Sequence, residues 1–448
     1  MSTDINVETD RRKVASFIDG HNPSSGRLAR TRRAGLMLSF VALLAPYFEL
    51  RIPGTSFTLV NLILVIGLIG ALIGGLKGRC SAPFFLVNKY GSMLMVGLVF
   101  VAIGILSGLT GILWGGLQLH TPNLFSVMGQ YAFIMIGFPV FLAYWLKIDQ
   151  VWGFLRLVAL GYMIPMLITV ACMYPAMPEV IRETFFIAGR ATGTFGNANS
   201  FAIVLVTVMP IYLVLSIVER GWWKFIGVIG LLLAVLNLIL TASFSGFLLF
   251  FVIFVINFLL ALVWRRHPIR THLTKILKLG FVLLLIGAAL IIAISDSFFS
   301  ENQRRDRFEL LFNKEDVTVS ELGSVGIRVA LIEEAVDAIV NRSGGVWGHG
   351  LGQSRTWSTH SYSVHLTYLL LWIEGGIVQL LLYLIFIGML LLNAWKLSSQ
   401  YPLIAMTMGL GVLTIFFSGF ITTHIYLSFF WLPLLPVFGS WHYLKVNS

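Results

Sequence analysis

Apolar runs of about 18 or more residues recur from one end of the chain to the other, and they constrain its fold more than any other feature. As an α-helix, such a run spans the bilayer hydrocarbon, which is about 30 Å thick. Backbone polar groups in lipid must be bonded within the protein, so only helices and closed barrels can cross it. Barrel strands would alternate over roughly ten residues. The sequence therefore predicts an all-α polytopic membrane protein.

The composition agrees with this class. Of the 448 residues, 57% are hydrophobic and 11% are charged, whereas soluble domains carry roughly 25% charged residues. The net charge is +11, but the basic residues lie between apolar runs, where they set the orientation of membrane helices. We therefore expect no nucleic-acid partner.

The apolar runs predict about twelve transmembrane helices. They lie near residues 35–50, 56–76, 90–108, 124–146, 151–174, 199–218, 223–242, 246–264, 276–294, 370–395, 401–419 and 423–443. The side richer in Lys and Arg is taken as cytoplasmic, which places both termini in the cytoplasm. The chain then divides into a cytoplasmic tail (1–33), transmembrane helices 1–9 (34–294), a periplasmic loop (295–362) and transmembrane helices 10–12 (363–448).

Two external segments are too long and too polar to be simple turns. One runs from Tyr174 to Ser200, and the other is the loop at 295–362. The loop contains "SVGIRVALIEEAVDAIV", which predicts an amphipathic helix lying over the membrane. Its apolar residues at helical spacing are Val329, Ile332, Val336, Ile339 and Val340.

Basic residues on the external side need an explanation, because positive charge is disfavoured there. The orientation places arginines 182, 190, 304, 305, 307, 328, 342 and 355 outside. The planar guanidinium fork suits phosphate oxygens, as a lipid-linked diphosphate would present them. The alternative is that these arginines pair with acidic residues in ordinary folded loops.

Three stretches together resemble the O-antigen ligase and polymerase family, membrane glycosyltransferases of bacterial surface polysaccharide assembly. The first is "GRATGTFGNANSFA", which contains Arg190, Asn197 and Asn199. The second is "GIRVALIEEAVDAIVNRSGGVWGHGLG", a helix led by Arg328 and ended by Gly-x-Gly-Leu-Gly. The third is "THSYSVHLTYLLLWIEGGI", in which the family places a histidine about eleven residues before a glycine. The resemblance covers roughly residues 185–390.

Two histidines of the third stretch compete for the family position. His365 precedes Gly376 by eleven residues, although Leu366 stands where the family usually has a small polar residue. His360 is followed by the fitting Ser361, but its spacing to a glycine is wrong. The resemblance therefore favours His365 over His360 as the catalytic residue. Without the resemblance, the alternative is that each histidine only caps a helix or forms a hydrogen bond at the start of one.

The chain departs from the family pattern in the external turn "LTASFSGF". Phe244 stands there where the family often carries an arginine. One phosphate contact implied by the resemblance is thus missing, and Arg182 or Arg355 is a candidate to replace it.

The resemblance implies a GT-C-like fold and transfer of glycan from undecaprenyl diphosphate at the periplasmic face of the bacterial inner membrane. Arginines would stabilise the leaving diphosphate. A neutral histidine, its pKa lowered by burial and by nearby arginines, would accept the proton of the attacking sugar hydroxyl. The implied reaction inverts the anomeric carbon and needs no metal or cofactor. Asn197 and Asn199 would bind sugar or phosphate, or else cap a helix.

Three functions stay open. The favoured one is a polysaccharide polymerase, with a second lipid-linked glycan as acceptor and a chain-length regulator as a candidate partner. The second is a ligase that moves the glycan to lipid A-core of lipopolysaccharide. The third is a transporter or flippase of lipid-linked oligosaccharide. The third is disfavoured because the predicted spans hold almost no acidic residue other than Glu374.

Overall fold

The computed structural model describes part of the chain, with gaps. The described residues are 69, 82–115, 121–139, 148–174, 176–187, 189–263, 324–341, 344–351, 353, 364–398, 401–423 and 428–438. The predicted tail, the predicted spans at 35–50, 56–76 and 276–294, and most of the predicted periplasmic loop lie outside these residues.

Long apolar helices dominate the described part. Those long enough to cross a membrane are α4 (Ala82–Gly115), α7 (Ile148–Ala171), α9 (Ala198–Val218), α10 (Gly221–Leu240) and α17 (Thr367–Leu397). Further apolar helices are α5 (Thr121–Ala132) with its π-helical continuation η1 (Phe133–Gly137), α11 (Phe244–Val263) and α18 (Pro402–Ser418). All coincide with predicted spans. The prediction of a mostly helical membrane protein is therefore confirmed, while the number twelve stays a prediction.

The remaining elements are α14 and several elements of two to seven residues. They are α8 (Glu179–Phe185), the strands β1 (Phe186–Ile187) and β2 (Arg190–Ala191), α14 (Ser324–Asn341), α15 (Gly344–Trp347), α19 (Ser428–Trp431), the 3-10 turn η3 (Leu432–Leu434) and α20 (Leu435–Phe438). The strands form an antiparallel ribbon in which Phe186 pairs with Ala191. A helix is present at the predicted position as α14, while the periplasmic location of the loop around it stays a prediction.

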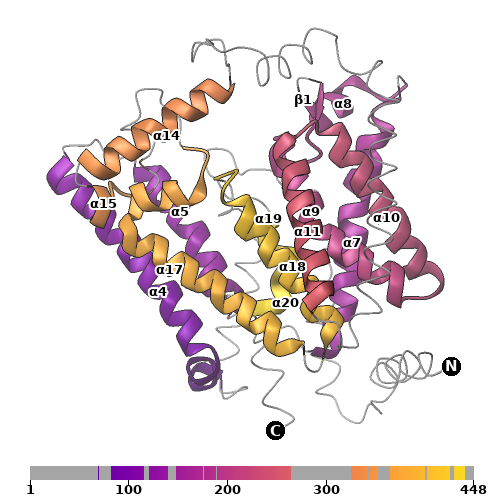
Figure 1. Ribbon diagram of the computed structural model, residues 1–448, viewed down its shortest axis with the longest axis horizontal. Helices are drawn as coiled ribbons and strands as arrows, with labels where there is room; N and C mark the ends of the chain where they lie inside the picture. Colours follow the sequence, from indigo (N-terminus) through magenta and orange to yellow (C-terminus); the bar gives the residue numbers. More distant parts are fainter. Residues whose placement is uncertain are drawn as a thin grey trace.

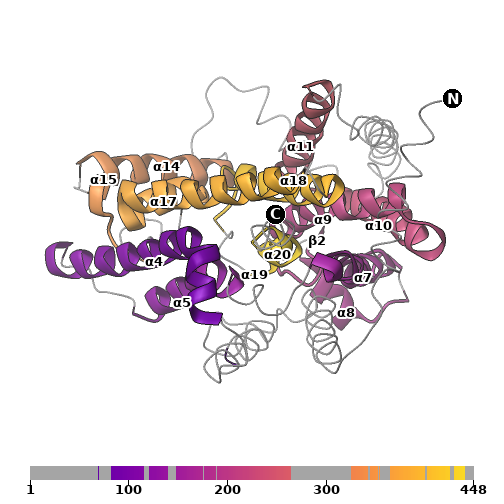
Figure 2. The ribbon, with the colours of Figure 1, turned by 90° about the horizontal axis from the view of Figure 1, so that it is seen from below.

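The long helices form two groups (Figures 1 and 2). One contains α4, α5 and α17, with α14 and α15 packed at one end. The other contains α7, α9, α10 and α11. Helix α18 packs against both α17 and α9, so it joins the groups. Helix α14 and the ribbon next to α8 lie at the same end of the bundle (Figure 1).

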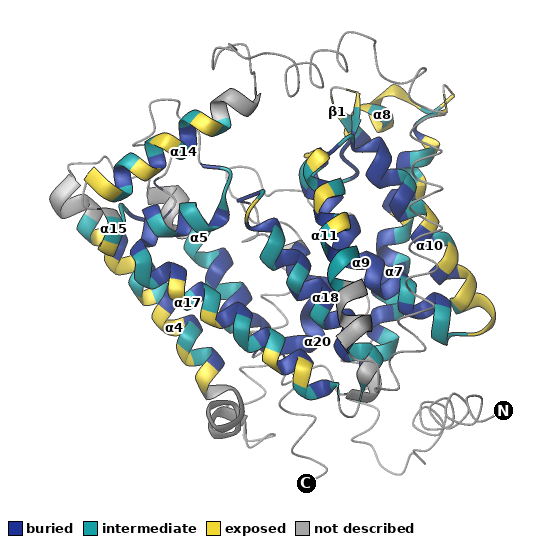
Figure 3. Ribbon diagram, in the orientation of Figure 1, coloured by how far each residue is buried: buried dark blue, intermediate teal, exposed yellow. Residues whose placement is uncertain are grey.

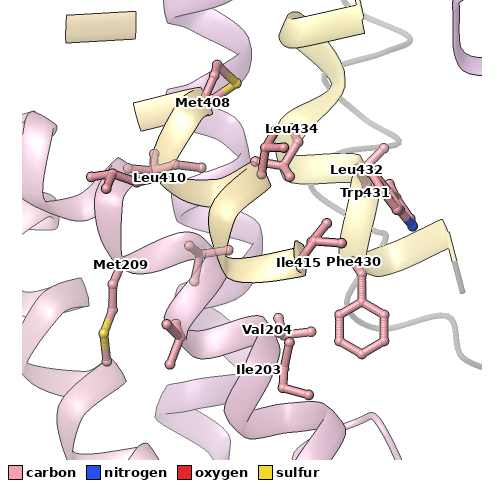
Figure 4. Packing of buried hydrophobic residues seen from close by; sticks show 14 of the residues in the cluster. Ile203, Val204, Met209, Met408, Leu410, Ile415, Phe430, Trp431, Leu432 and Leu434 are labelled. Atoms are coloured by element: carbon pink, nitrogen blue, oxygen red, sulfur yellow. The ribbon is translucent and has the colours of Figure 1, made fainter. Parts of the chain in front are cut away.

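Helix α9 is the centre of the second group. It is apolar on all sides, and 83% of its membrane-length window is buried, as expected for a helix enclosed by others. Close packing needs small neighbours: a Cβ on Gly230 of α10 would lie 2.2 Å from the Tyr212 ring. Figure 4 shows the contact of α9 with α18 and the C-terminal helices. The outer faces of α4 and α10 are exposed (Figure 3), as surfaces that meet lipid would be.

Candidate functional site

Helix α17 is broken near its start. Gly376 has φ +75°, and a Cβ at this position would lie 1.9 Å from the Val346 carbonyl oxygen. This conformation favours glycine. Beside the break, the carbonyl oxygen of Ile373 accepts a hydrogen bond from the backbone N of His349 at 2.7 Å. The carbonyl oxygen of Glu374 accepts one from the backbone N of Gly350 at 2.8 Å. The predicted span at 370–395 is thus an interrupted helix, and the turn at residues 348–351 bonds to the carbonyl oxygens beside the break.

The turn that completes α17 is the "GHGLG" stretch after α15. A Cβ on Gly348 would lie 2.4 Å from the Glu374 carbonyl oxygen, so only glycine allows this approach. Ser107 of α4 joins the same point: its Oγ donates to the Glu374 carbonyl oxygen and accepts from the Gly350 backbone N at 3.1 Å. The glycines of the second and third stretches therefore pack against one another. We name this contact, formed by Ser107, residues 348–351 and residues 373–376, the α17 junction.

Helix α14 lies over the start of α17. Its Leu331 and Ala335 form a small core with Val364 and Ile373. Sequence reasoning missed this face of α14. Its buried side chains are Leu331, Ala335 and Ala338. Of the predicted stripe, Val329, Val336 and Val340 are 41%, 48% and 70% exposed. The helix thus has one apolar face against the protein and another that is exposed.

His365 lies two residues before α17 begins and is half-buried. Burial lowers the pKa of its imidazole, and the positive charge of Arg328 lowers it further. The backbone N of Thr367 donates to the Gly419 carbonyl oxygen at 2.8 Å, which fixes the chain next to His365 against the end of α18. The structure therefore brings Arg328 to His365 and favours a neutral imidazole.

The Arg328 guanidinium forms no hydrogen bond or ion pair with any residue in the described ranges. The side chain is half-buried. Its charge is therefore not neutralised by a described carboxylate, as the ordinary paired-loop alternative would require.

Arg190 has a different environment. Its Nε donates to the Thr241 carbonyl oxygen at 2.9 Å, and its Nη2 donates to Asn199 Oδ1 at 3.2 Å and to the Ala242 carbonyl oxygen at 3.4 Å. The Oγ of Ser243 donates to the same Asn199 oxygen at 2.9 Å. The guanidinium thus lies at the turn between α10 and α11. Phe244, which follows this turn at the start of α11, is 75% exposed.

Of the other predicted site residues, some lie within the described part of the chain and some lie outside it. Asn197 caps α9, because its Oδ1 accepts from the backbone N of Asn199 at 2.8 Å and of Ser200 at 3.3 Å. The capping interpretation is confirmed for Asn197. Arg182 of α8 donates from Nη2 to the Met177 carbonyl oxygen at 3.2 Å. Arg355 and His360 lie outside the described residues, so the choice between His365 and His360 stays a prediction.

Comparison with known proteins supports the resemblance. Residues 229–384 match the model of the family described as O-antigen ligase. The match contains Arg328, His365 and Gly376, whereas Arg190 and Asn197 precede it. No curated protein matches the chain.

Proposed function

We propose that this chain, which belongs to the O-antigen ligase family through residues 229–384, polymerises undecaprenyl-diphosphate-linked oligosaccharide repeat units. The observation that carries the proposal is that the positive charge of Arg328 acts on the half-buried imidazole of His365. A guanidinium without a described acidic partner lies close enough to lower the pKa of a half-buried imidazole. A site that must bind a diphosphate and accept a proton needs these two groups side by side.

In the proposed reaction, a hydroxyl oxygen of the acceptor sugar attacks the anomeric carbon of the donor. The carbon–oxygen bond to the diphosphate breaks as the new glycosidic bond forms, with inversion at that carbon. Neutral His365 accepts the hydroxyl proton. Arg328 stabilises the negative charge that develops on the departing undecaprenyl diphosphate. The diphosphate is already a good leaving group, so this scheme contains no metal ion or organic cofactor.

The remaining arginines have proposed supporting roles. Arg190 lies at the turn where the family often carries an arginine, and it can contribute positive charge there while it holds the turn. Arg182 and Arg355 are further candidates for donor binding. Asn199 contacts Arg190 directly and would orient it. Helix α14 and the ribbon beside α8 lie at one end of the bundle (Figure 1), which supports a site shared by these elements at the periplasmic face of the inner membrane.

The ligase function is the second candidate, because the matching family is described as O-antigen ligase. Both reactions use the same donor chemistry at Arg328 and His365. They differ in the acceptor, which is another lipid-linked glycan for a polymerase and lipid A-core for a ligase.

The deciding experiment gives purified, reconstituted protein a lipid-linked oligosaccharide with and without lipid A-core, and measures product size. A ladder of products without the core supports the polymerase. Product that requires the core supports the ligase. Movement of the oligosaccharide across the liposome without any covalent product would contradict both and support a transporter.

A further inference from the structure

The α17 junction connects parts of the chain that are far apart in sequence. Ser107 and Gly350 are separated by 243 residues, and Ser107 and Glu374 by 267. Ser107 is 2% exposed and lies on α4, outside the segment that matches the family. Its hydroxyl is both donor and acceptor, which a serine can supply within one buried contact.

The junction sets the position of the chain that carries Arg328. Residues 324–341 form α14, and α15 leads from its end into the turn held at the junction. The Nε1 of Trp372 on α17 donates to the Gly345 carbonyl oxygen at 2.8 Å, so α15 is also fixed to α17. Movement of α15 or of the turn along α17 would have to break these bonds, and α14 packs against both α15 and α17.

The other partner, His365, is fixed from the opposite side. The chain next to it is bonded to the turn after α18 through Thr367, and the Tyr368 hydroxyl donates to the Phe416 carbonyl oxygen. Arg328 and His365 are therefore held by separate attachments, one through the junction and one through α18. Their mutual position depends on both attachments.

We propose that Ser107 is a positioning residue, which fixes the external turn to the break in α17 and so holds Arg328 at the working distance from His365. Ser107 does not touch the donor; it acts through Gly350 and Glu374. This role rests on the proposed transferase function, but the bond it depends on can be tested without activity.

The Ser107→Ala variant removes the bridging hydroxyl and leaves the Gly350 bond to Glu374 in place, so the protein is expected to fold. Hydrogen exchange in peptides covering residues 344–353 should become about fivefold to tenfold faster, as expected for loss of one buried hydrogen bond. Thr110→Val is the matched control. It removes a hydroxyl one turn along the same helix, whose bond goes only to the Ser107 carbonyl oxygen. Ser107→Thr keeps the hydroxyl and should retain slow exchange.

The pH dependence of kcat/KM provides a second test, because a residue with a purely structural role would not change it. Arg328 is the charged group of the described part that acts on His365. If α14 shifts in Ser107→Ala, the acid limb of kcat/KM for the donor should move to higher pH, while Thr110→Val stays at the wild-type position. Donor kcat should fall about tenfold, because small misplacements of reacting groups reduce the rate strongly.

Several outcomes would overturn the proposal. Unchanged exchange in Ser107→Ala would show that the hydroxyl does not hold the turn. Equal effects in Thr110→Val would indicate general loosening of α4. Faster exchange with an unchanged pH profile would show that the turn does not position Arg328. A wild-type protein without transferase activity would contradict the proposed function, and the exchange comparison would still decide whether Ser107 holds the turn.

Discussion

Arg190 and Arg328 lie on elements at the same end of the bundle (Figure 1), yet their surroundings differ. The Arg190 guanidinium donates to Thr241, Ala242 and Asn199, and so joins the start of α9 to the turn between α10 and α11. The Arg328 guanidinium bonds to no described residue, and its charge acts on the imidazole of His365. Arg190 is thus bonded to neighbouring elements of the fold, whereas Arg328 acts through its charge on the titratable His365.

The difference separates two ways in which an arginine can matter. A guanidinium that satisfies backbone carbonyl oxygens contributes mainly to stability, because its loss leaves buried acceptors without a donor. A guanidinium without such bonds contributes little to folding, so its expected role is to bind a ligand. A change at Arg328 should therefore lower activity more than stability, whereas a change at Arg190 should lower stability more than activity.

The largest effect is expected at His365. His365→Ala should reduce the transfer rate about 10²-fold to 10⁴-fold at neutral pH, the range for loss of a general base. The melting temperature should change little, because the side chain is only half-buried. Transfer assays on matched amounts of reconstituted protein measure this. Full activity in His365→Ala together with loss of activity in His360→Ala would give the role to His360.

Arg328→Gln should reduce kcat/KM for the donor about tenfold to a hundredfold, since a charge-assisted contact to phosphate is worth about 1.5–3 kcal/mol. Thermal stability should remain close to wild type. The measurement is a donor titration combined with a melting curve in the same detergent. Exposed Glu333, on the same helix, offers a control: Glu333→Gln should leave both quantities unchanged. If Arg328→Gln lowered thermal stability as much as Arg190→Gln does, the proposed difference between the roles of the two arginines would be wrong.

Arg190→Gln should affect stability rather than donor use. It should lower the free energy of unfolding by about 1–3 kcal/mol. Asn199→Ala should lower it by less, because Arg190 keeps its bonds to the two carbonyl oxygens. Unfolding monitored with and without donor measures both effects. Arg190→Gln with wild-type stability and a strongly raised donor KM would instead make Arg190 a direct diphosphate ligand.

The smallest effect concerns pH. The pKa of His365 is lowered from about 6.5 by burial and by Arg328, and the neutral form is the active base. Activity should therefore persist below the ordinary histidine pKa and fall only as pH drops through the lowered value. In Arg328→Gln the fall should begin at higher pH, because the repelling charge is absent. Profiles of kcat/KM against pH compare the two proteins, and identical acid limbs would contradict an effect of the Arg328 charge on the His365 pKa.

The local features of the site were largely predictable. Helical spacing predicted α14, and the "GNANS" stretch contains a residue type that caps helices, as Asn197 does for α9. The buried face of α14 was missed, because two of its three buried residues are alanines, whose small side chains give a weak periodic signal. The break in α17 was also missed, since a glycine within an apolar run is equally compatible with a continuous membrane helix.

Composition and apolar run length are enough to show that this chain is a helical membrane protein, and its motifs identify the arginines and the histidine to test. Apolar length and helical period are local properties, so they can be counted along the chain. Helix packing, by contrast, sets which arginine is bonded to backbone carbonyl oxygens, which one acts on His365 through its charge, and that Ser107 bonds to a residue 243 positions away. Those contacts depend on how separate helices pack, and no local pattern encodes the partner of a buried hydroxyl or the carbonyl oxygen left open by a broken helix.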